Sequence, residues 1–477
     1  MKSTMQPETG LSLAGGEHRW AVVGGVAIVA AIVGAVLTQA NWILIAALLV
    51  LPIFLIRPRA LALGIYAFLL PFDSLSAVGP EGVTLTSIAG AAVVAILLGT
   101  AMVRRELHKP PRQALWWTLF IAWAGVTVLW ALEWKPATGR LPTAISLLVV
   151  YLVVLSTNVT RKELQTISLF LVGGGFVAAL YAIFQFLAGS GYHESNRASL
   201  MSGTAAADPN YFAASLLLPL SLAIFGFLTP RSWFIRTGWL AAAGTIAFGI
   251  LATMSRGSLL AVGVMILFYM YTGKVSRSML IPLVAIFVAL MFFLPETFFN
   301  RIETATKSGG SGRTVIWQGG LVAFAHNAVA GAGLNNFPYA YRKNLGSAPM
   351  LYGTTVWAPH NSYLEIAVDT GSIGLALMLT AIVAQLRIAS RTRKRTSNQL
   401  GSVIVAYEAG CYAILLAVFF IGAIWEKWFW MAWMLTAVAV RTAQLEQRAE
   451  VPVPVTQTAT LRWHDFPVRS APRTPLP

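Results

Sequence analysis

The sequence predicts an all-α protein, a polytopic membrane helix bundle of about 12–14 transmembrane helices. Of its 477 residues, 57% are hydrophobic and 11% are charged, whereas about a quarter of an average soluble domain is charged. The apolar residues gather in runs, and a helix of about 20 apolar residues crosses a bilayer. Composition, run length and the number of runs together give this fold class.

Fourteen apolar runs are the expected helices. They lie at 21–38, 41–56, 60–77, 84–103, 114–132, 141–157, 165–188, 210–229, 238–254, 257–272, 278–294, 361–386, 403–421 and 427–441. Several runs are short for a complete span, and Pro71 and glycine-rich patches interrupt others, which lowers the expected number to about 12–14. The first run is not followed by a small-residue cleavage site, so we expect a span there and not a removed signal peptide.

The distribution of Lys and Arg predicts which way the bundle faces. Basic residues accumulate in cytoplasmic loops, and every second loop of this chain is basic, as at Arg57 and Arg59 or between Arg387 and Arg395. With the N-terminus inside, 24 of the 34 basic residues fall on the cytoplasmic side. Topology and attraction to anionic lipid headgroups then explain the formal net charge of +16, and charges scattered in this way do not favour nucleic-acid binding.

This topology divides the chain into five parts. We expect a cytoplasmic N-terminus at 1–20, an N-terminal transmembrane bundle of about 11 spans at 21–294, a long periplasmic loop at 295–360, about three C-terminal spans at 361–441 and a disordered cytoplasmic tail at 442–477. Long loops in compact folds are usually functional, so the loop at 295–360 is the expected location of the site. Its amphipathic stretch, Val315 to Ala325, predicts a helix along the membrane surface.

Several classes of site are absent from the sequence. Cys411 is the single cysteine, which excludes an intramolecular disulfide and a cysteine metal cluster. No GxGxxG, P-loop or HExxH pattern occurs, which argues against an ATPase or a zinc hydrolase.

Two arginine motifs lie outside the membrane in this topology. Arg256, in Ser255-Arg256-Gly257, either snorkels to the interface or binds an anion at the membrane surface. Arg313 follows a glycine-rich turn, where backbone N–H groups and a guanidinium can converge on phosphate oxygens.

Two further motifs begin apolar runs on the same side. His360 lies where the long loop re-enters the bilayer, and it is either a hydrogen-bonded structural group or a proton acceptor. In the stretch Ala207 to Ala213, Asp208 is expected to cap a helix whose first residue is Pro209.

The order of these motifs resembles that of one family, the O-antigen ligase and polysaccharide polymerase superfamily. The resemblance runs from about Asp208 to Leu375 through Asp-Pro-Asn-Tyr-Phe-Ala, Ser-Arg-Gly, Gly-Arg followed by Ile-Trp and GAGLNNF, and His-Asn-Ser-Tyr-Leu-Glu with Gly371 and Gly374. It implies a membrane glycosyltransferase of the C-type architecture in the bacterial cytoplasmic (inner) membrane, with its active site facing the periplasm. It also implies a glycan donor on undecaprenyl diphosphate, a saccharide or lipid A-core acceptor, and no metal or nucleotide sugar.

The resemblance assigns roles to three residues. Arg256 and Arg313 match arginines that the family uses on the diphosphate of the lipid donor, and His360 matches the histidine implicated in handling the acceptor hydroxyl. Fixed guanidinium groups stabilise the charge that builds on a departing diphosphate. A neutral imidazole can accept the proton of the attacking hydroxyl, and a single in-line attack inverts the sugar.

Other polar residues are candidates for substrate binding or for orienting His360. They are Arg197, Asn361, Tyr363, Glu365 and Arg342. Tyr363 and Glu365 could equally cap the helix that they begin, and His326 is expected to be structural. Gly371 and Gly374 are expected to allow close helix packing.

Two alternatives stay open at this point. A secondary transporter or flippase for lipid-linked glycans is a rival, although such proteins tend to have paired broken helices and ionisable residues at mid-span, and Glu408 is the clearest mid-run carboxylate here. Within the family, the sequence does not separate a ligase that attaches finished glycan to lipid A-core from a polymerase that joins repeat units.

Overall fold

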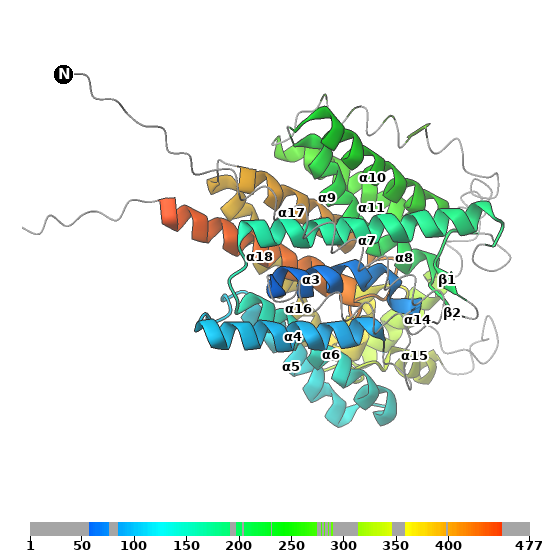
Figure 1. Cartoon of the computed structure of the whole chain (residues 1–477). Helices are drawn as coiled ribbons and strands as arrows, with labels where there is room; N and C mark the ends of the chain where they lie inside the picture. Colours follow the sequence, from blue (N-terminus) through cyan, green and yellow to red (C-terminus); the bar gives the residue numbers. More distant parts are fainter. Residues whose placement is uncertain are drawn as a thin grey trace, which may run out of the picture.

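The computed structural model confirms an all-α polytopic membrane fold. It describes residues 57–75, 84–190, 197–202, 205–229, 231–273, 313–345, 358–396 and 399–450, with isolated positions between 278 and 289. Two strands of two residues each, β1 (Met201–Ser202) and β2 (Ala205–Ala206), form a small antiparallel hairpin. All other regular elements in these ranges are helices (Figure 1).

The first helices are α3 (Pro58–Leu69), α4 (Leu85–Arg104), α5 (Ala114–Val126), α6 (Trp134–Leu155) and α7 (Arg161–Leu187), with 3-10 turns η1 (Leu70–Leu75) and η2 (Thr127–Trp130) after α3 and α5. Next come α8 (Pro209–Ser215), α9 (Leu217–Leu228), α10 (Trp233–Ala252) and α11 (Arg256–Thr272). The chain continues with α14 (Arg313–His326), α15 (Phe337–Leu345), α16 (Ser362–Arg395), α17 (Gln399–Ala417) and α18 (Lys427–Glu450).

Eleven of the fourteen predicted runs coincide with these helices. The runs at 21–38 and 41–56 lie outside the described residues, as does almost all of 278–294. Within the described ranges, six helices are long and apolar enough to cross a membrane and three further apolar helices are shorter. The helix expected in the long loop is α14.

Two helix ends differ from the sequence expectation. The run at 210–229 is divided at Leu216, where α8 ends and α9 begins; α8 contacts α11. α18 continues to Glu450, nine residues past the expected end of the span at 441. The tail beyond Glu450 lies outside the described residues.

A buried aromatic cluster joins α5, α6 and α18. The Trp117 ring packs against Trp430 and Trp433, with ring centroids 5.0 and 5.9 Å apart. Its indole Nε1 donates to the side-chain oxygen of Gln385 over 3.1 Å, and the Tyr151 hydroxyl donates to the same oxygen over 3.0 Å. Because these two hydrogen bonds satisfy the side-chain oxygen of Gln385, this polar residue of α16 is buried in the apolar interior at little cost.

Loops that the sequence places on one side of the membrane come together at one end of the bundle. On the predicted outer side, Lys427, the first residue of α18, donates to both carboxylate oxygens of Asp73, over 2.9 and 3.1 Å, and to Thr84 and Thr86. On the predicted inner side, the beginnings of α3 and α7 meet the end of α4. Figure 1 shows the hairpin, α14 and α15 at the end opposite the last turn of α18.

The mid-run carboxylate Glu408 is paired. It accepts from Arg393 Nε over 2.5 Å, and both side chains are buried. Arg393 belongs to the basic cluster at the end of α16, so Glu408 faces the predicted cytoplasmic end of the bundle. This pair removes the main sequence feature that favoured a transporter.

Candidate functional site

Two tight turns place polar groups at the outer end of the bundle. Asp208 caps α8, because its carboxylate accepts from the backbone N–H of Asn210 over 2.7 Å, and Pro209 is the first residue of that helix, as predicted. Between α10 and α11 the chain turns within three residues, and Met254 has a positive φ of 54°. α11 therefore begins at Arg256, beside the start of α8.

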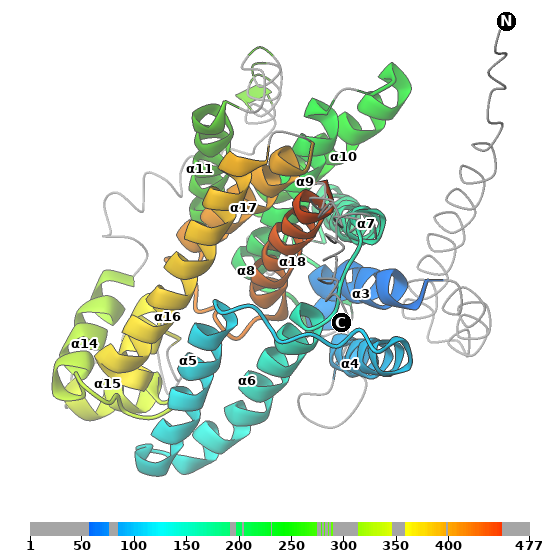
Figure 2. The ribbon, with the colours of Figure 1, turned by 90° about the vertical axis from the view of Figure 1, so that its left-hand side faces the viewer.

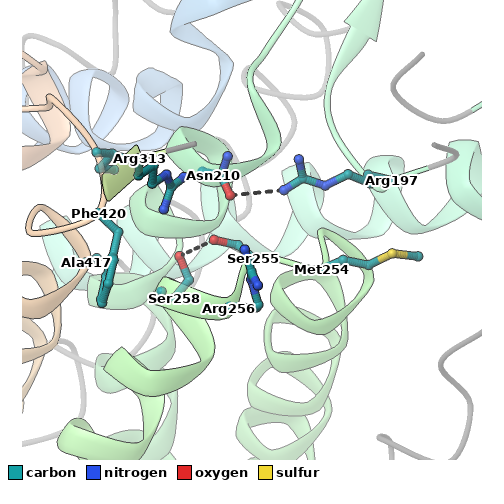
Figure 3. A pocket seen from close by; sticks show the side chains of 11 residues that line it. Arg197, Asn210, Met254, Ser255, Arg256, Ser258, Arg313, Ala417 and Phe420 are labelled. Atoms are coloured by element: carbon teal, nitrogen blue, oxygen red, sulfur yellow. Dashed lines mark hydrogen bonds between the residues drawn. The ribbon is translucent and has the colours of Figure 1, made fainter. Parts of the chain in front are cut away.

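These turns border a cavity of about 100 Å³ that contains both predicted donor-binding arginines (Figure 3). Its lining comes from four parts of the chain that are far apart in sequence. The lining residues are Arg197, Asn210, Met254, Ser255, Arg256, Gly257, Ser258, Arg313, Ala417, Phe420 and Ile421. Polar atoms therefore converge beside an apolar wall formed by the end of α17 and the residues after it.

Arg197 is the third guanidinium of this cavity and is itself buried. Its Nε donates to the Thr253 carbonyl over 2.7 Å, and one terminal nitrogen donates to the Asn210 side-chain oxygen over 3.0 Å. In Figure 3, Asn210 lies between Arg197 and Arg313, which approach from opposite sides. The hydrogen bonds fix Arg197 before any ligand binds, so an anion meets an arranged charge and not a flexible one.

The electrostatics of the cavity favour an anion. Burial lowers the pKa of Arg313, and repulsion from Arg256 lowers it further, while Asp208 acts in the opposite direction. An arginine stays charged under these conditions. Two guanidiniums that repel each other in a poorly hydrated cavity are stabilised when a negatively charged group enters between them.

Arg313 is held in place through α14. One turn further on, the Trp317 indole donates to the Pro359 carbonyl over 3.2 Å, and its ring packs edge-on against Phe419 at 5.3 Å. At Gly320, a Cβ atom would lie 2.7 Å from a Leu364 methyl group, so α14 packs closely against α16 here and a larger residue would displace this methyl group. Pro359, whose carbonyl accepts this hydrogen bond from Trp317, directly precedes His360 in the sequence.

The linker between α14 and α15 is bound to α16 at a kink. Gly371 has φ 69° and ψ −174°, a conformation essentially restricted to glycine. The break in α16 at Gly371 lets the Ser372 N–H donate to the Ala328 carbonyl over 2.8 Å. The Asp369 carboxylate accepts from the backbone N–H groups of Asn335 and Asn336 over 2.8 and 3.0 Å. The motif GAGLNNF is therefore a docking segment. Both glycines were expected to pack against a neighbouring helix, but Gly371 contacts this linker instead. Gly374 does lie against a helix, because Trp123 of α5 is 3.1 Å from the position of an added Cβ.

His360 lies next to this assembly. Its backbone has a positive φ of 46°, and its side chain is half-buried. Burial lowers the pKa of His360, the charge of Arg313 lowers it further, and Asp208 opposes them. Its Nδ1 is buried with no hydrogen-bond partner among the described residues. His360 is not part of the cavity lining, but these interactions place it beside Arg313.

The residues after His360 fix the start of α16. Asn361 is its N-cap, because its side-chain oxygen accepts from the N–H groups of Tyr363 and Leu364. The Tyr363 hydroxyl donates to the Leu415 carbonyl over 2.9 Å. Glu365 is buried, and its Oε2 has no partner among the described residues. Asn361 and Tyr363 thus have structural contacts that position His360.

Two other candidates lie apart from the cavity. Arg342 is exposed near the end of α15 and is not a lining residue. His326 ends α14, is exposed, and its Nδ1 lies 2.9 Å from the Val322 carbonyl of its own helix. In the ranges that the structure describes, no three His, Cys, Asp or Glu side chains come together as metal ligands.

A comparison with protein families gives one match: residues 240–379 fit the family described as O-antigen ligase. This match supports a place for the chain in the O-antigen ligase superfamily. A search of curated proteins found no match. The matched segment contains Arg256, Arg313 and His360, together with Gly371. The match and the apolar helices support a multi-pass membrane glycosyltransferase of the ligase or polymerase type.

Two residues of the site were not predicted. Asn210 fixes Arg197 and lines the cavity, and Trp317 connects the helix of Arg313 to the residue before His360. Both belong to motifs that the sequence singles out, Asp-Pro-Asn-Tyr-Phe-Ala and Gly-Arg followed by Ile-Trp. The motifs indicate where polar groups begin a helix, but only the folded chain brings Arg197 to Asn210.

Proposed function

We propose that this protein transfers a glycan from undecaprenyl diphosphate to a saccharide acceptor on the periplasmic side of the bacterial inner membrane. The acceptor is either lipid A-core or the end of a growing O-antigen or exopolysaccharide. The observation that carries the proposal is the presence of three guanidiniums, Arg197, Arg256 and Arg313, on one cavity at the predicted outer end of the bundle.

Arg256 and Arg313 are the proposed ligands of the donor diphosphate. In the transfer step, the acceptor oxygen bonds to the anomeric carbon, and the bond between that carbon and the diphosphate oxygen breaks. The diphosphate leaves with the bonding electron pair, so its negative charge grows in the transition state. Fixed positive groups act on this developing charge, and removing one such group typically lowers the rate about 10²–10³-fold.

His360 is the proposed base. The attacking hydroxyl must lose its proton, and a neutral imidazole accepts it. Burial and Arg313 lower the pKa of His360, which keeps the ring neutral at physiological pH. A positioned base contributes about 10²–10⁴-fold to a rate. A single displacement of this kind inverts the configuration at the sugar, and no step in it calls for a metal ion.

Reconstitution of the purified protein with an undecaprenyl-diphosphate glycan tests the proposal. We expect transfer to one of two acceptors, lipid A-core oligosaccharide or a second lipid-linked repeat unit, and the acceptor used distinguishes ligase from polymerase. Arg256→Gln and Arg313→Gln should each reduce transfer about 10²–10³-fold. Arg112→Gln, which changes an exposed arginine at the opposite end, is the matched control. Full transfer by both cavity variants would remove the diphosphate assignment.

The same vesicles test the rival function. A flippase moves the intact lipid-linked glycan across the bilayer without breaking the anomeric bond. Movement of intact donor with no product bond would replace the enzyme proposal by a transporter.

A further inference from the structure

A second basic cavity lies at the opposite end of the bundle from the proposed site. It has a volume of about 230 Å³ and is lined by Arg57, Pro58, Arg59, Arg104, Thr160, Lys162 and Glu163. These residues come from the beginnings of α3 and α7 and from the end of α4. Figure 2 shows α3 between α7 and α4, and α3 packs against both helices.

The charge of this cavity is strongly positive. Four of its lining side chains are basic and one is acidic. The acidic one, Glu163, is already engaged, because its carboxylate accepts from the backbone N–H of Thr160 over 2.8 Å and from the Thr160 hydroxyl over 2.9 Å. The first turns of α3 and α7 add the partial positive charge of helix N-termini. The cavity therefore attracts an anion.

Arg59 is the buried part of this arrangement. It is 5% exposed, donates to the Asn158 carbonyl over 3.0 Å and is ion-paired with Glu106. Arg104 and Lys162 are exposed, and Arg57 is half-buried. The cavity thus has the buried, hydrogen-bonded Arg59 at its floor and the more exposed basic side chains of Arg57, Arg104 and Lys162 at its rim.

The surroundings point to a lipid as the source of the anion. Met102 and Val103, directly before Arg104, are 65% and 86% exposed, and α4 is one of the helices long and apolar enough to cross a membrane. Apolar side chains exposed on such a helix face acyl chains. The cavity lies where the basic loops predict the cytoplasmic surface, and basic pockets between membrane helices on that side bind anionic headgroups.

We infer that this cavity binds the phosphate group of an anionic phospholipid. The lipid phosphate lies among Arg57, Arg104 and Lys162, and its acyl chains run along the exposed face of α4. The site is distinct from the proposed transfer site and does not depend on the reaction catalysed there. Because the same basic side chains would also attract free phosphate, the test separates the two sources.

Native mass spectrometry of the full-length protein, titrated with phosphatidylglycerol, phosphatidylcholine or inorganic phosphate, tests this inference. The test variant is Arg57→Gln/Arg104→Gln/Lys162→Gln, which leaves the buried Arg59 intact. The control is Lys109→Gln/Arg112→Gln/Arg395→Gln, which removes three charges from exposed residues on the same predicted side.

We expect phosphatidylglycerol to bind the test variant about 10²-fold more weakly than the unchanged protein, since each of the three basic residues near a lipid surface contributes about 1 kcal/mol and about 1.4 kcal/mol corresponds to a tenfold change in affinity. The control variant should bind within about twofold of the unchanged protein. Equal losses in both variants would overturn the site, since they would indicate general surface charge. Binding of inorganic phosphate as tight as that of phosphatidylglycerol would overturn the lipid assignment. Equal thermal stability of both variants, measured in parallel, ensures that a loss reflects the cavity and not unfolding.

Discussion

The kink at Gly371 is the point at which one added methyl group should disconnect the proposed site. In Gly371→Ala the new Cβ would lie 2.1 Å from the Val329 carbonyl oxygen and 2.6 Å from the Gly331 nitrogen. Both contacts are with backbone, which cannot move aside as a side-chain tip can. The residue would also have to keep a φ of 69° with ψ −174°, a conformation that costs a non-glycine residue about 1–3 kcal/mol.

The total cost follows from these two effects. Overpacking a tight contact adds about 1–3 kcal/mol, so undocking of the linker becomes more favourable by about 2–6 kcal/mol. Even the lower figure reduces the ratio of docked to undocked linker about 30-fold. The linker positions α14, and α14 positions Arg313, so glycan transfer should fall in proportion to the lost docked population, by at most the factor in the docking ratio, while the protein still inserts into the membrane.

The assay compares transfer by Gly371→Ala and Gly263→Ala in the same reconstituted vesicles. Gly263 lies within α11, and a Cβ there would meet no atom within 4 Å, so the control changes helix propensity but no contact. Susceptibility of the long loop to limited proteolysis gives a second measurement that does not depend on catalysis. Unchanged transfer and unchanged proteolysis in Gly371→Ala would refute the argument that docking at this kink positions the arginine.

Three further predictions concern the same assembly. His360→Ala should lower transfer about 10²–10⁴-fold, whereas His326→Ala, at an exposed residue of α14, should leave it unchanged; equal rates would return His360 to a structural role. The base form of His360 is the neutral ring, and its pKa is lowered, so transfer should be lost only as the pH falls below the ordinary histidine value of about 6.5. A pH–rate profile with its acidic midpoint at or above that value contradicts this assignment. Trp317→Phe keeps the ring contact with Phe419 but removes the donor to Pro359; transfer should fall about fivefold, consistent with loss of one hydrogen bond of about 1 kcal/mol, and a rate equal to that of the unchanged protein would show that the bond does not position His360.

Much of the fold could be predicted because membrane helices are specified locally. An apolar run of sufficient length has few alternatives in a bilayer, and the alternation of basic loops fixes which ends lie together. The interruption of the helix at Leu216 could not be predicted, because nothing in the local apolar pattern marks it.

The site could be predicted in part for a different reason. Arg256, Arg313 and His360 begin helices or turns, and charged residues in such places need an explanation in a membrane protein. The contacts that align them come from residues whose types carry no such signal. Trp317 resembles any interfacial aromatic residue, and the carboxylate of Asp369 acts on the backbone of Asn335 and Asn336, which no side-chain pattern reveals.

The hydrogen bond from Trp317 to the Pro359 carbonyl connects two segments of the proposed site. It ties the segment carrying the proposed phosphate ligand to the segment carrying the proposed proton acceptor. The separation between Arg313 and His360 is then restrained locally, by the contact of α14 with the residue before His360. Membranes of different thickness should therefore change this separation less than they change the tilt of the lipid-facing helices.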